Sequence, residues 1–455
     1  ALGCALQSGR PAIAVCTSGT AATHFHGAVA EAGISRVPLI VCTANRPPEL
    51  WGVGAPQTID QTDLYGVSGA TFHRSRPPDD TDPSEWRELA NTVWAAALSP
   101  GPVQLDCPFR EPLWANPESL PAPIPTPSPP DPPGATADDV ADVVATITRR
   151  GAACGVVVAG RGESDPQAIA DVADRLGWPV IADHRSGART DGALRRFDTI
   201  LRDADGLRTG IDHVLYFGEP LSSKVLSQTV AAVAAGGGTV HRFVPWSRTI
   251  DPERCATAQI PERLAAAEVG AALHRTSVAR VDGWRERWVR ADRSVVEQQA
   301  SLLEPGSEPA VAAHALADVP RGGALVVSSS MPVRDLEWFG PPRSDVAVHS
   351  NRGANGIDGV LATAIGVATT GVATLCLVGD VALVHDSSSL AALSGRSVDL
   401  TIVVVDNDGG GIFHFLPQRT QLPAERFEQL FGTPHRTDLH ALAAAHGIVA
   451  EPVSY

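Results

Sequence analysis

The sequence contains no long hydrophobic run, because its apolar stretches are short and end at Gly, Asp or Pro. A helix that spans a bilayer needs about 20 apolar residues in succession, so we expect no membrane partner. Positive charge is also scarce: 36 basic side chains face 51 acidic ones, and the net charge is −15. Without a block of basic residues, the sequence argues against nucleic acid as the main partner.

Cysteine, methionine and lysine are infrequent too. The seven cysteines are an odd number without a C-x-x-C pair, which favours free thiols in a reducing, cytoplasmic setting. The only methionine is Met331 and residue 1 is Ala, so we expect a chain truncated at its start, and a last domain that stops short. The only lysine is Lys224.

What is present is typical of a globular protein. Hydrophobic residues make up 44% and charged residues 19% of the 455 positions, enough for two to four domains. Short β-branched runs alternate with helical patterns, which indicates parallel sheets with crossover helices. We predict helices at 21–32 and 84–98 and a helical region at 260–304. We predict strands at 12–16, 38–45, 102–108, 155–160, 179–183, 213–218, 239–244, 324–330, 345–350, 373–380 and 400–407.

A proline-rich stretch divides this pattern. Eleven prolines between Pro108 and Gly134 are too many for a helix or a central strand. We therefore predict three α/β domains, each a Rossmann-like, doubly wound parallel sheet. The first covers 1–110, a linker covers 111–135, and the middle and last domains cover 136–308 and 309–455.

The strongest chemical signal lies in the last domain. Asp380 ends one predicted strand, Asn407 ends the next, and "GGGIF" follows. One helical crossover fits between them, and crossovers bring the carboxyl ends of parallel strands side by side. A carboxylate, an amide oxygen and a glycine-rich loop are suited to Mg²⁺ and a diphosphate. Each piece alone is better explained as a tight turn or a loop after a buried strand, whereas the pair at this spacing favours a metal–diphosphate site.

The pair resembles the motif of thiamin diphosphate enzymes, which runs from GD to an Asn, often a double Asn whose first member is Asp406 here. Further segments resemble one branch of that superfamily, the 2-succinyl-5-enolpyruvyl-6-hydroxy-3-cyclohexene-1-carboxylate synthases of menaquinone biosynthesis. They are "TSGTAA" (17–22), "TANRPPEL" (43–50), "GAPQTIDQ" (54–61), "SSSMPVRD" (328–335), "SNRGANGIDG" (350–359), "HDSSSL" (385–390), "DNDGGGIFHFLP" (406–417) and "FGTPH" (431–435). The middle domain matches poorly apart from "FGEPLSSK".

The resemblance implies a set of cofactor contacts. Thiamin diphosphate would lie against Gly379, Asp380, Asn407, Gly409, Gly410, Gly411 and Ile412, and Asp380, Asn407 and Gly409 would bind Mg²⁺ or Mn²⁺. In this superfamily a Glu of the first domain activates the cofactor, and by alignment it would lie upstream of Ala1. The cofactor lies between two subunits, so the resemblance implies a homodimer or a homotetramer.

It also implies the substrates, 2-oxoglutarate and isochorismate, which are joined with loss of CO₂. Both are dicarboxylates, which pair well with the planar fork of Arg. Arg46, Arg334 and Arg352 match the family's substrate-binding arginines, with Arg334 and Arg352 in catalytic roles, and Lys224 matches a family Lys. Each Arg taken singly could equally be a solvated surface charge.

Five further positions match the family, each with a plainer alternative. Gln57 matches a catalytic Gln and could be an ordinary loop amide. Ser330 matches a substrate contact and could cap a helix. Ile412, Phe413 and Leu416 match an apolar wall beside the cofactor, and plain core packing is the alternative.

Two other functions stay open. The chain could be another thiamin diphosphate enzyme, such as an acetolactate synthase or a 2-oxoacid decarboxylase, although small apolar oxoacids need fewer cations. It could also be a non-catalytic homologue that binds a ligand without turnover.

Overall fold

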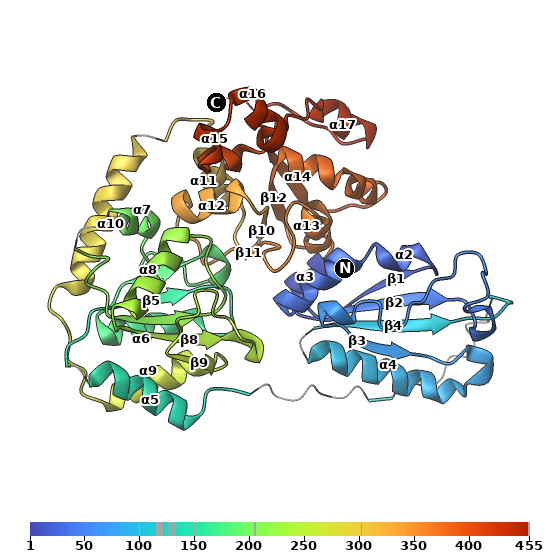
Figure 1. The fold of residues 1–455 in the computed structure, drawn as a ribbon, viewed down its shortest axis with the longest axis horizontal. Coiled ribbons are helices and arrows are strands. Elements are labelled where there is room, and N and C mark those ends of the chain that lie inside the picture. The colour runs from blue at the N-terminus through green and yellow to red at the C-terminus, as the bar shows by residue number, and fades with distance from the viewer. Residues whose placement is uncertain are drawn as a thin grey trace.

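The computed structural model contains three parallel sheets, each covered by helices (Figure 1). It describes the whole chain except residues 100, 115–121, 123, 126–127, 129–132, 150, 204–205, 302 and 454–455. Much of the predicted linker therefore lies outside the described residues. Within the described part, no helix has both the length and the apolar character needed to cross a membrane.

The first sheet has the strand order β1-β2-β4-β3, and all its pairs are parallel. Its elements are α1 (Leu2–Ser8), β1 (Ala12–Cys16), α2 (Thr20–Thr23), α3 (His26–Ser35), β2 (Leu39–Asn45), β3 (Thr71–Arg74), α4 (Pro83–Leu98) and β4 (Pro102–Pro108).

The middle sheet has the order β6-β5-β7-β8-β9, again all parallel, and holds the largest hydrophobic core. Phe217 and Phe243 stack in this core with ring centroids 4.2 Å apart, and Trp284 meets Trp288 edge-on at 5.8 Å. The elements are α5 (Ala137–Thr148), β5 (Gly155–Ala159), α6 (Pro166–Leu176), β6 (Val180–Ala182), α7 (Phe197–Arg202), β7 (His213–Phe217), α8 (Lys224–Ala235), β8 (Thr239–Val244), β9 (Ala258–Pro261), α9 (Ala265–Arg275) and α10 (Trp284–Ala300).

The third sheet has the parallel order β11-β10-β12-β13. Its elements are α11 (Glu308–Asp318), β10 (Ala324–Val327), α12 (Met331–Phe339), β11 (Ala347–His349), α13 (Val360–Ala368), β12 (Thr374–Gly379), α14 (Asp380–His385), β13 (Leu400–Val405), the 3₁₀ turn η8 (Gly411–Phe415), α15 (Gln418–Gln421), α16 (Ala424–Phe427) and α17 (Leu439–Ala445). The first and third domains meet where α1 crosses α13 (Figure 1). A Cβ on Gly3 would lie 1.9 Å from the carbonyl oxygen of Thr363, so glycine is required at this crossing.

The α/β class is thus confirmed, one predicted helix is wrong, and two strands were not predicted. Strands β3 and β9 were missed, because the first has His and Arg in four residues and the second ends at Pro261, a residue that weakens a strand prediction. The single helix predicted at 21–32 is two helices. The Tyr65 hydroxyl donates to the Ala22 carbonyl at 2.5 Å, which is the acceptor that a continuous helix would use for the N–H of His26.

One buried carboxyl in the middle domain leads to a prediction about stability. Glu262 is 1% exposed, accepts a hydrogen bond from the Ser164 N–H at 3.2 Å, and has a second oxygen without a hydrogen-bond partner in the described part of the chain. The pKa of Glu262 is raised from 4.5 to about 7, mainly by burial and also by the charge of Glu163, while hydrogen bonds from the Glu163 and Ser164 segment act in the opposite direction. The folded state therefore binds the proton more tightly than the unfolded state, so this stability is full below pH 4.5 and declines as the pH rises to 7.

We expect Glu262→Gln to be more stable than the wild type at pH 8, by on the order of 2 kcal/mol, because the charged form is no longer buried. Thermal unfolding at pH 5 and pH 8 measures this, with the exposed Glu268→Gln on α9 as the control. If the wild type and Glu262→Gln lose the same stability between the two pH values, this assignment is wrong.

Candidate active site

The carboxyl edge of the third sheet gathers the predicted site residues of the last domain. Asp380 follows β12 and Asn407 follows β13, and the register pairs Gly379 with Val405 at the ends of these adjacent strands. Because β13 ends at Val405, Asn407 lies in the loop and not at the strand end that we predicted. The structure nevertheless brings the two segments together, as the crossover spacing predicts.

Asp380 lies at the carboxyl ends of β12 and β13 and is buried, with 2% of its surface exposed. Its Oδ2 accepts the Gly409 N–H at 2.9 Å and lies 3.2 Å from Nε2 of His435. Ligand atoms of Asp380, Asp406 and His435 lie within 4.8 Å of one another. Neither Asp406 nor His435 was predicted as a site residue, although "FGTPH" was among the recognised segments. The two carboxylates of this group are oxygen donors of the kind that Mg²⁺ takes beside a diphosphate.

The glycine-rich loop packs tightly beside Asp380. Gly409 has φ 149°, and a Cβ there would lie 2.1 Å from the Gly432 carbonyl oxygen, so a larger residue would displace the 432–435 segment that carries His435. Gly410 donates its N–H to the same carbonyl at 2.7 Å. The Asn407 side chain donates from Nδ2 to Glu308 at 2.8 Å, which fixes one end of its amide.

The other half of the edge carries cations. Arg334 lies on α12, which follows β10, and its Nη1 donates to the Ser330 carbonyl at 2.6 Å. Arg352 follows β11 and is half-buried. Burial lowers the pKa of Arg352, and Arg185 and Arg334 lower it further, while Glu337 acts in the opposite direction. Asp183 also raises the pKa of Arg352, and Arg185 is itself ion-paired with Asp183 and Glu219.

Ser330 occupies the N-cap position of α12 with φ 74°, but its side chain accepts no capping hydrogen bond. Ser330 therefore has the N-cap position that the alternative predicts, but not the capping hydrogen bond. The core-packing alternative is wrong for Phe413 and Leu416, which are 39% and 40% exposed, while Ile412 is partly buried in the same turn. Phe413 also meets Phe431 edge-on at 5.9 Å.

The middle domain presents Lys224 from the loop after β7. Lys224 is exposed, begins α8 and lines a pocket of about 270 Å³ with Tyr216, Leu221, Ser222, Ser223 and Glu253. Glu337 of α12 accepts the Ser222 N–H at 2.8 Å and so joins this loop to the helix that carries Arg334. Burial raises the pKa of Glu337 to about 7.

Gln57 and Arg46, the two predicted site residues of the first domain, lie at the carboxyl edge of the first sheet. Gln57 donates from Nε2 to Thr17 and to the Ser18 carbonyl, at 3.2 and 3.1 Å. Arg46 follows β2, and its buried Nε has no hydrogen-bond partner among the residues that the structure describes. The strands of this sheet run with their carboxyl ends away from the middle domain (Figure 1). The structure does not bring Gln57 and Arg46 together with Lys224.

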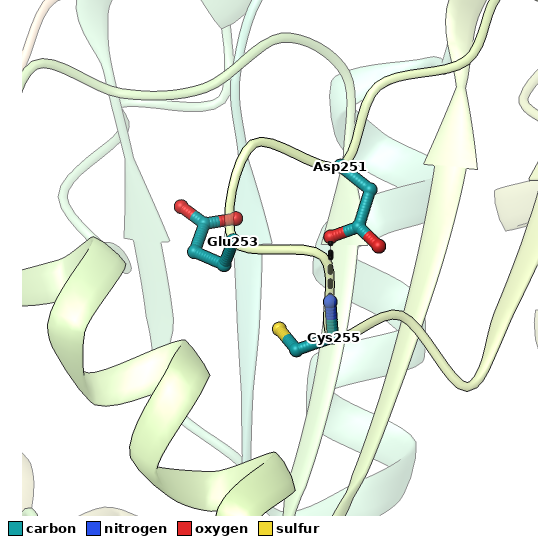
Figure 2. Close-up of side chains that lie close together, drawn as sticks. All are labelled: Asp251, Glu253 and Cys255. Atoms are coloured by element: carbon teal, nitrogen blue, oxygen red, sulfur yellow. Dashed lines mark hydrogen bonds between the residues drawn. The ribbon is translucent and has the colours of Figure 1, made fainter.

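A second acidic cluster lies beside the Lys224 pocket, formed by Asp251, Glu253 and Cys255 (Figure 2). Arg242 forms an ion pair with Glu253 and lies 3.6 Å from Asp251. Asp251 also accepts the Cys255 N–H at 3.1 Å. Burial raises the pKa of the Cys255 thiol, which disfavours the thiolate that binds metals. Arg242 already offsets part of the charge of the two carboxylates, and we assign no metal to this cluster.

Comparison with known proteins identifies all three sheets. Residues 1–64 match the N-terminal thiamine pyrophosphate-binding domain, 139–326 the middle domain and 328–454 the C-terminal thiamine pyrophosphate-binding domain of thiamine pyrophosphate enzymes.

Relatives named 2-succinyl-5-enolpyruvyl-6-hydroxy-3-cyclohexene-1-carboxylate synthase match nearly the full chain. That of Myxococcus xanthus is 39% identical over 98% of this chain and 80% of its own length, and that of Rubrobacter xylanophilus is 39% identical over the same shares. That of Haloarcula marismortui is 36% identical over 100% of this chain and 82% of its own length. The chain belongs to this synthase family within the thiamin diphosphate-dependent enzymes.

Proposed function

We propose that the protein joins 2-oxoglutarate to isochorismate with loss of CO₂, the reaction of menaquinone biosynthesis that gives 2-succinyl-5-enolpyruvyl-6-hydroxy-3-cyclohexene-1-carboxylate. One observation carries the proposal. A single sheet edge holds the oxygen donors of Asp380 and Asn407 after β12 and β13, and the cations Arg334 and Arg352 after β10 and β11. Such an edge suits a metal-bound diphosphate beside a dicarboxylate.

Asp380, Asn407 and the Gly409 backbone would hold Mg²⁺ or Mn²⁺, and the glycine-rich loop would hold the diphosphate. Gly379, Gly410, Gly411 and Ile412 complete the proposed cofactor contacts. When bound, thiamin diphosphate supplies a nucleophilic carbon and an electron sink for decarboxylation.

The remaining residues bind and orient the substrates. Arg334, Arg352 and Lys224 would neutralise their carboxylates, with Ser330 beside Arg334. The exposed apolar turn that carries Ile412, Phe413 and Leu416 would exclude water from the reacting carbons. Holding two dicarboxylates against cations lowers the cost of bringing like charges together.

We propose that Gln57 and Arg46 contribute to the active site of a second copy of the chain. Arg46 directly follows β2, and Gln57 contacts Thr17 and Ser18, which follow β1, so both lie at the carboxyl edge of the first sheet. The strands of this sheet run away from the middle domain (Figure 1). We therefore propose that the edge of one copy faces the third sheet of another, in a homodimer or homotetramer. The division into 1–110, 136–308 and 309–455, with the linker between the first two, is part of the same proposal.

The decisive measurement is CO₂ release from 2-oxoglutarate by the full-length protein with thiamin diphosphate and Mg²⁺, with and without isochorismate. We expect release that requires every component and yields the coupled product. Release that is independent of isochorismate would favour another 2-oxoacid decarboxylase. No release would favour a homologue that binds a ligand without turnover and would refute the proposal.

A further inference from the structure

A carboxylate of the first domain holds the loop that carries Arg352. Glu31 lies on α3, is 2% exposed, and accepts the consecutive N–H groups of Gly353, Ala354 and Asn355 at 2.9, 2.6 and 3.0 Å. The Ser35 hydroxyl donates to the same carboxylate at 2.7 Å. Four donors on one buried carboxylate is an arrangement of charge-assisted bonds, each stronger than a neutral hydrogen bond.

The support behind Glu31 is itself fixed. The carbonyls at the end of α3 accept hydrogen bonds from two arginines of the middle domain: Arg161 donates to Ser35 at 3.1 Å, and Arg248 donates to Ile34. Helix α3 therefore contacts both other domains. The Glu31 side chain contacts the last domain, and the Ile34 and Ser35 carbonyls contact the middle domain. A rigid support of this kind can hold a loop in one position.

The loop is also braced from within. Asn351 donates to the Thr363 hydroxyl at 3.0 Å, and Asn355 donates to the Asp358 carbonyl at 3.1 Å. Gly353 leaves no room for a side chain, because a Cβ would lie 2.6 Å from the Ser35 hydroxyl and 3.0 Å from Glu31. Arg352 directly precedes the three amides that Glu31 holds, so its backbone is fixed on both sides.

We propose that Glu31 is a positioning residue that fixes Arg352 for the dicarboxylate substrates; this rests on the function proposed above. Glu31 acts only through the loop, by its bonds to residues 353–355. Removing it leaves three donors without an acceptor and lets the Arg352 backbone move. A displacement of about 1 Å of a positioning group is enough to cost about 100-fold in rate.

The first test compares Glu31→Gln with a matched control at the same domain contact. The amide keeps the shape and one acceptor oxygen but presents N–H to a donor. We expect kcat/KM for the substrate that Arg352 binds to fall by about 10-fold or more, mainly through KM. The control is Gln7→Ala, which removes the bond of α1 to His349 at 2.7 Å between the same two domains. Its kcat/KM stays within about twofold of the wild type. Equal losses in both variants would mean a merely loosened interface and would overturn the proposal.

The second test asks whether Glu31 acts through Arg352. The experiment is a double-mutant cycle. It compares kcat/KM of the wild type, Glu31→Gln, Arg352→Ala and the double variant. We expect Glu31→Gln to have almost no effect once Arg352 is gone. If Glu31→Gln lowers kcat/KM by the same factor in the wild type and in Arg352→Ala, Glu31 does not position Arg352.

The third test needs no turnover. Hydrogen exchange of the peptide that contains residues 353–355 is expected to speed up by about 10-fold or more in Glu31→Gln and to stay unchanged in Gln7→Ala. Unchanged exchange in Glu31→Gln would overturn the proposal even if activity fell. A wild type without turnover would refute the proposed function instead, and the exchange rates would then still decide whether Glu31 holds the loop.

Discussion

Asp380→Ala is expected to lower CO₂ release steeply and to remove the stabilisation of the protein by thiamin diphosphate and Mg²⁺. Asp380 is the buried carboxylate at the end of β12, and its Oδ2 meets both the Gly409 N–H and His435. If Asp380 binds the metal as we propose, its removal costs several kcal/mol, so we expect a loss on the order of 1,000-fold in kcat/KM. The measurements are turnover and the midpoint of thermal unfolding with and without cofactor and metal.

Two further variants separate charge from architecture. Asp380→Asn keeps an acceptor for the Gly409 N–H, so we expect a folded loop with the same loss of metal-dependent stabilisation. Asp399→Ala removes an exposed carboxylate at the amino end of β13, on the opposite edge of the same sheet, and is expected to leave turnover within about twofold. An Asp380→Ala protein that still gains stability from thiamin diphosphate and Mg²⁺ would exclude Asp380 as a ligand.

The neighbourhood of Asp380 and Asn407 could be predicted from the sequence because two local features determine it. Each residue follows a short β-branched run, and the 27-residue spacing admits one crossover helix, so the two strand ends had to be adjacent. The same argument placed Arg334 and Arg352 near strand ends. Fold class was predictable for the same reason, since the alternation of strands and helices is a property of the chain itself.

Long-range contacts could not be predicted in this way. Glu31 looks like an ordinary helical glutamate, and its role depends on amides 322 to 324 positions away in the sequence. Glu337 likewise acquires its contact with Ser222 only when the middle and last domains pack. Such contacts cannot be predicted from local periodicity or motif spacing, because both partners are polar groups in segments far apart in the sequence.

The second large effect is expected for Arg334→Ala. This variant should lose about 1.5–3 kcal/mol in binding or transition-state stabilisation, which corresponds to about 10- to 150-fold in kcat/KM. Arg334 lies on the first turn of α12, and its Nη1 contact with the Ser330 carbonyl holds the side chain at the edge of the sheet. Its charge also lies near Arg352, whose pKa it lowers. Removing Arg334 would therefore remove one proposed carboxylate contact and relieve the repulsion between the two cations, which limits the effect on protein stability.

Arg334→Lys distinguishes charge from geometry. Lysine restores the charge but cannot make the bidentate contact, so we expect recovery of only part of the lost kcat/KM. The control is Arg321→Ala, an arginine with a side chain 89% exposed that precedes β10 at the opposite edge of the same sheet. If Arg334→Ala leaves the kinetics of both substrates unchanged, Arg334 lies outside the substrate site. If Arg334→Lys restores full activity, a single positive charge suffices, and the argument from the planar guanidinium fails.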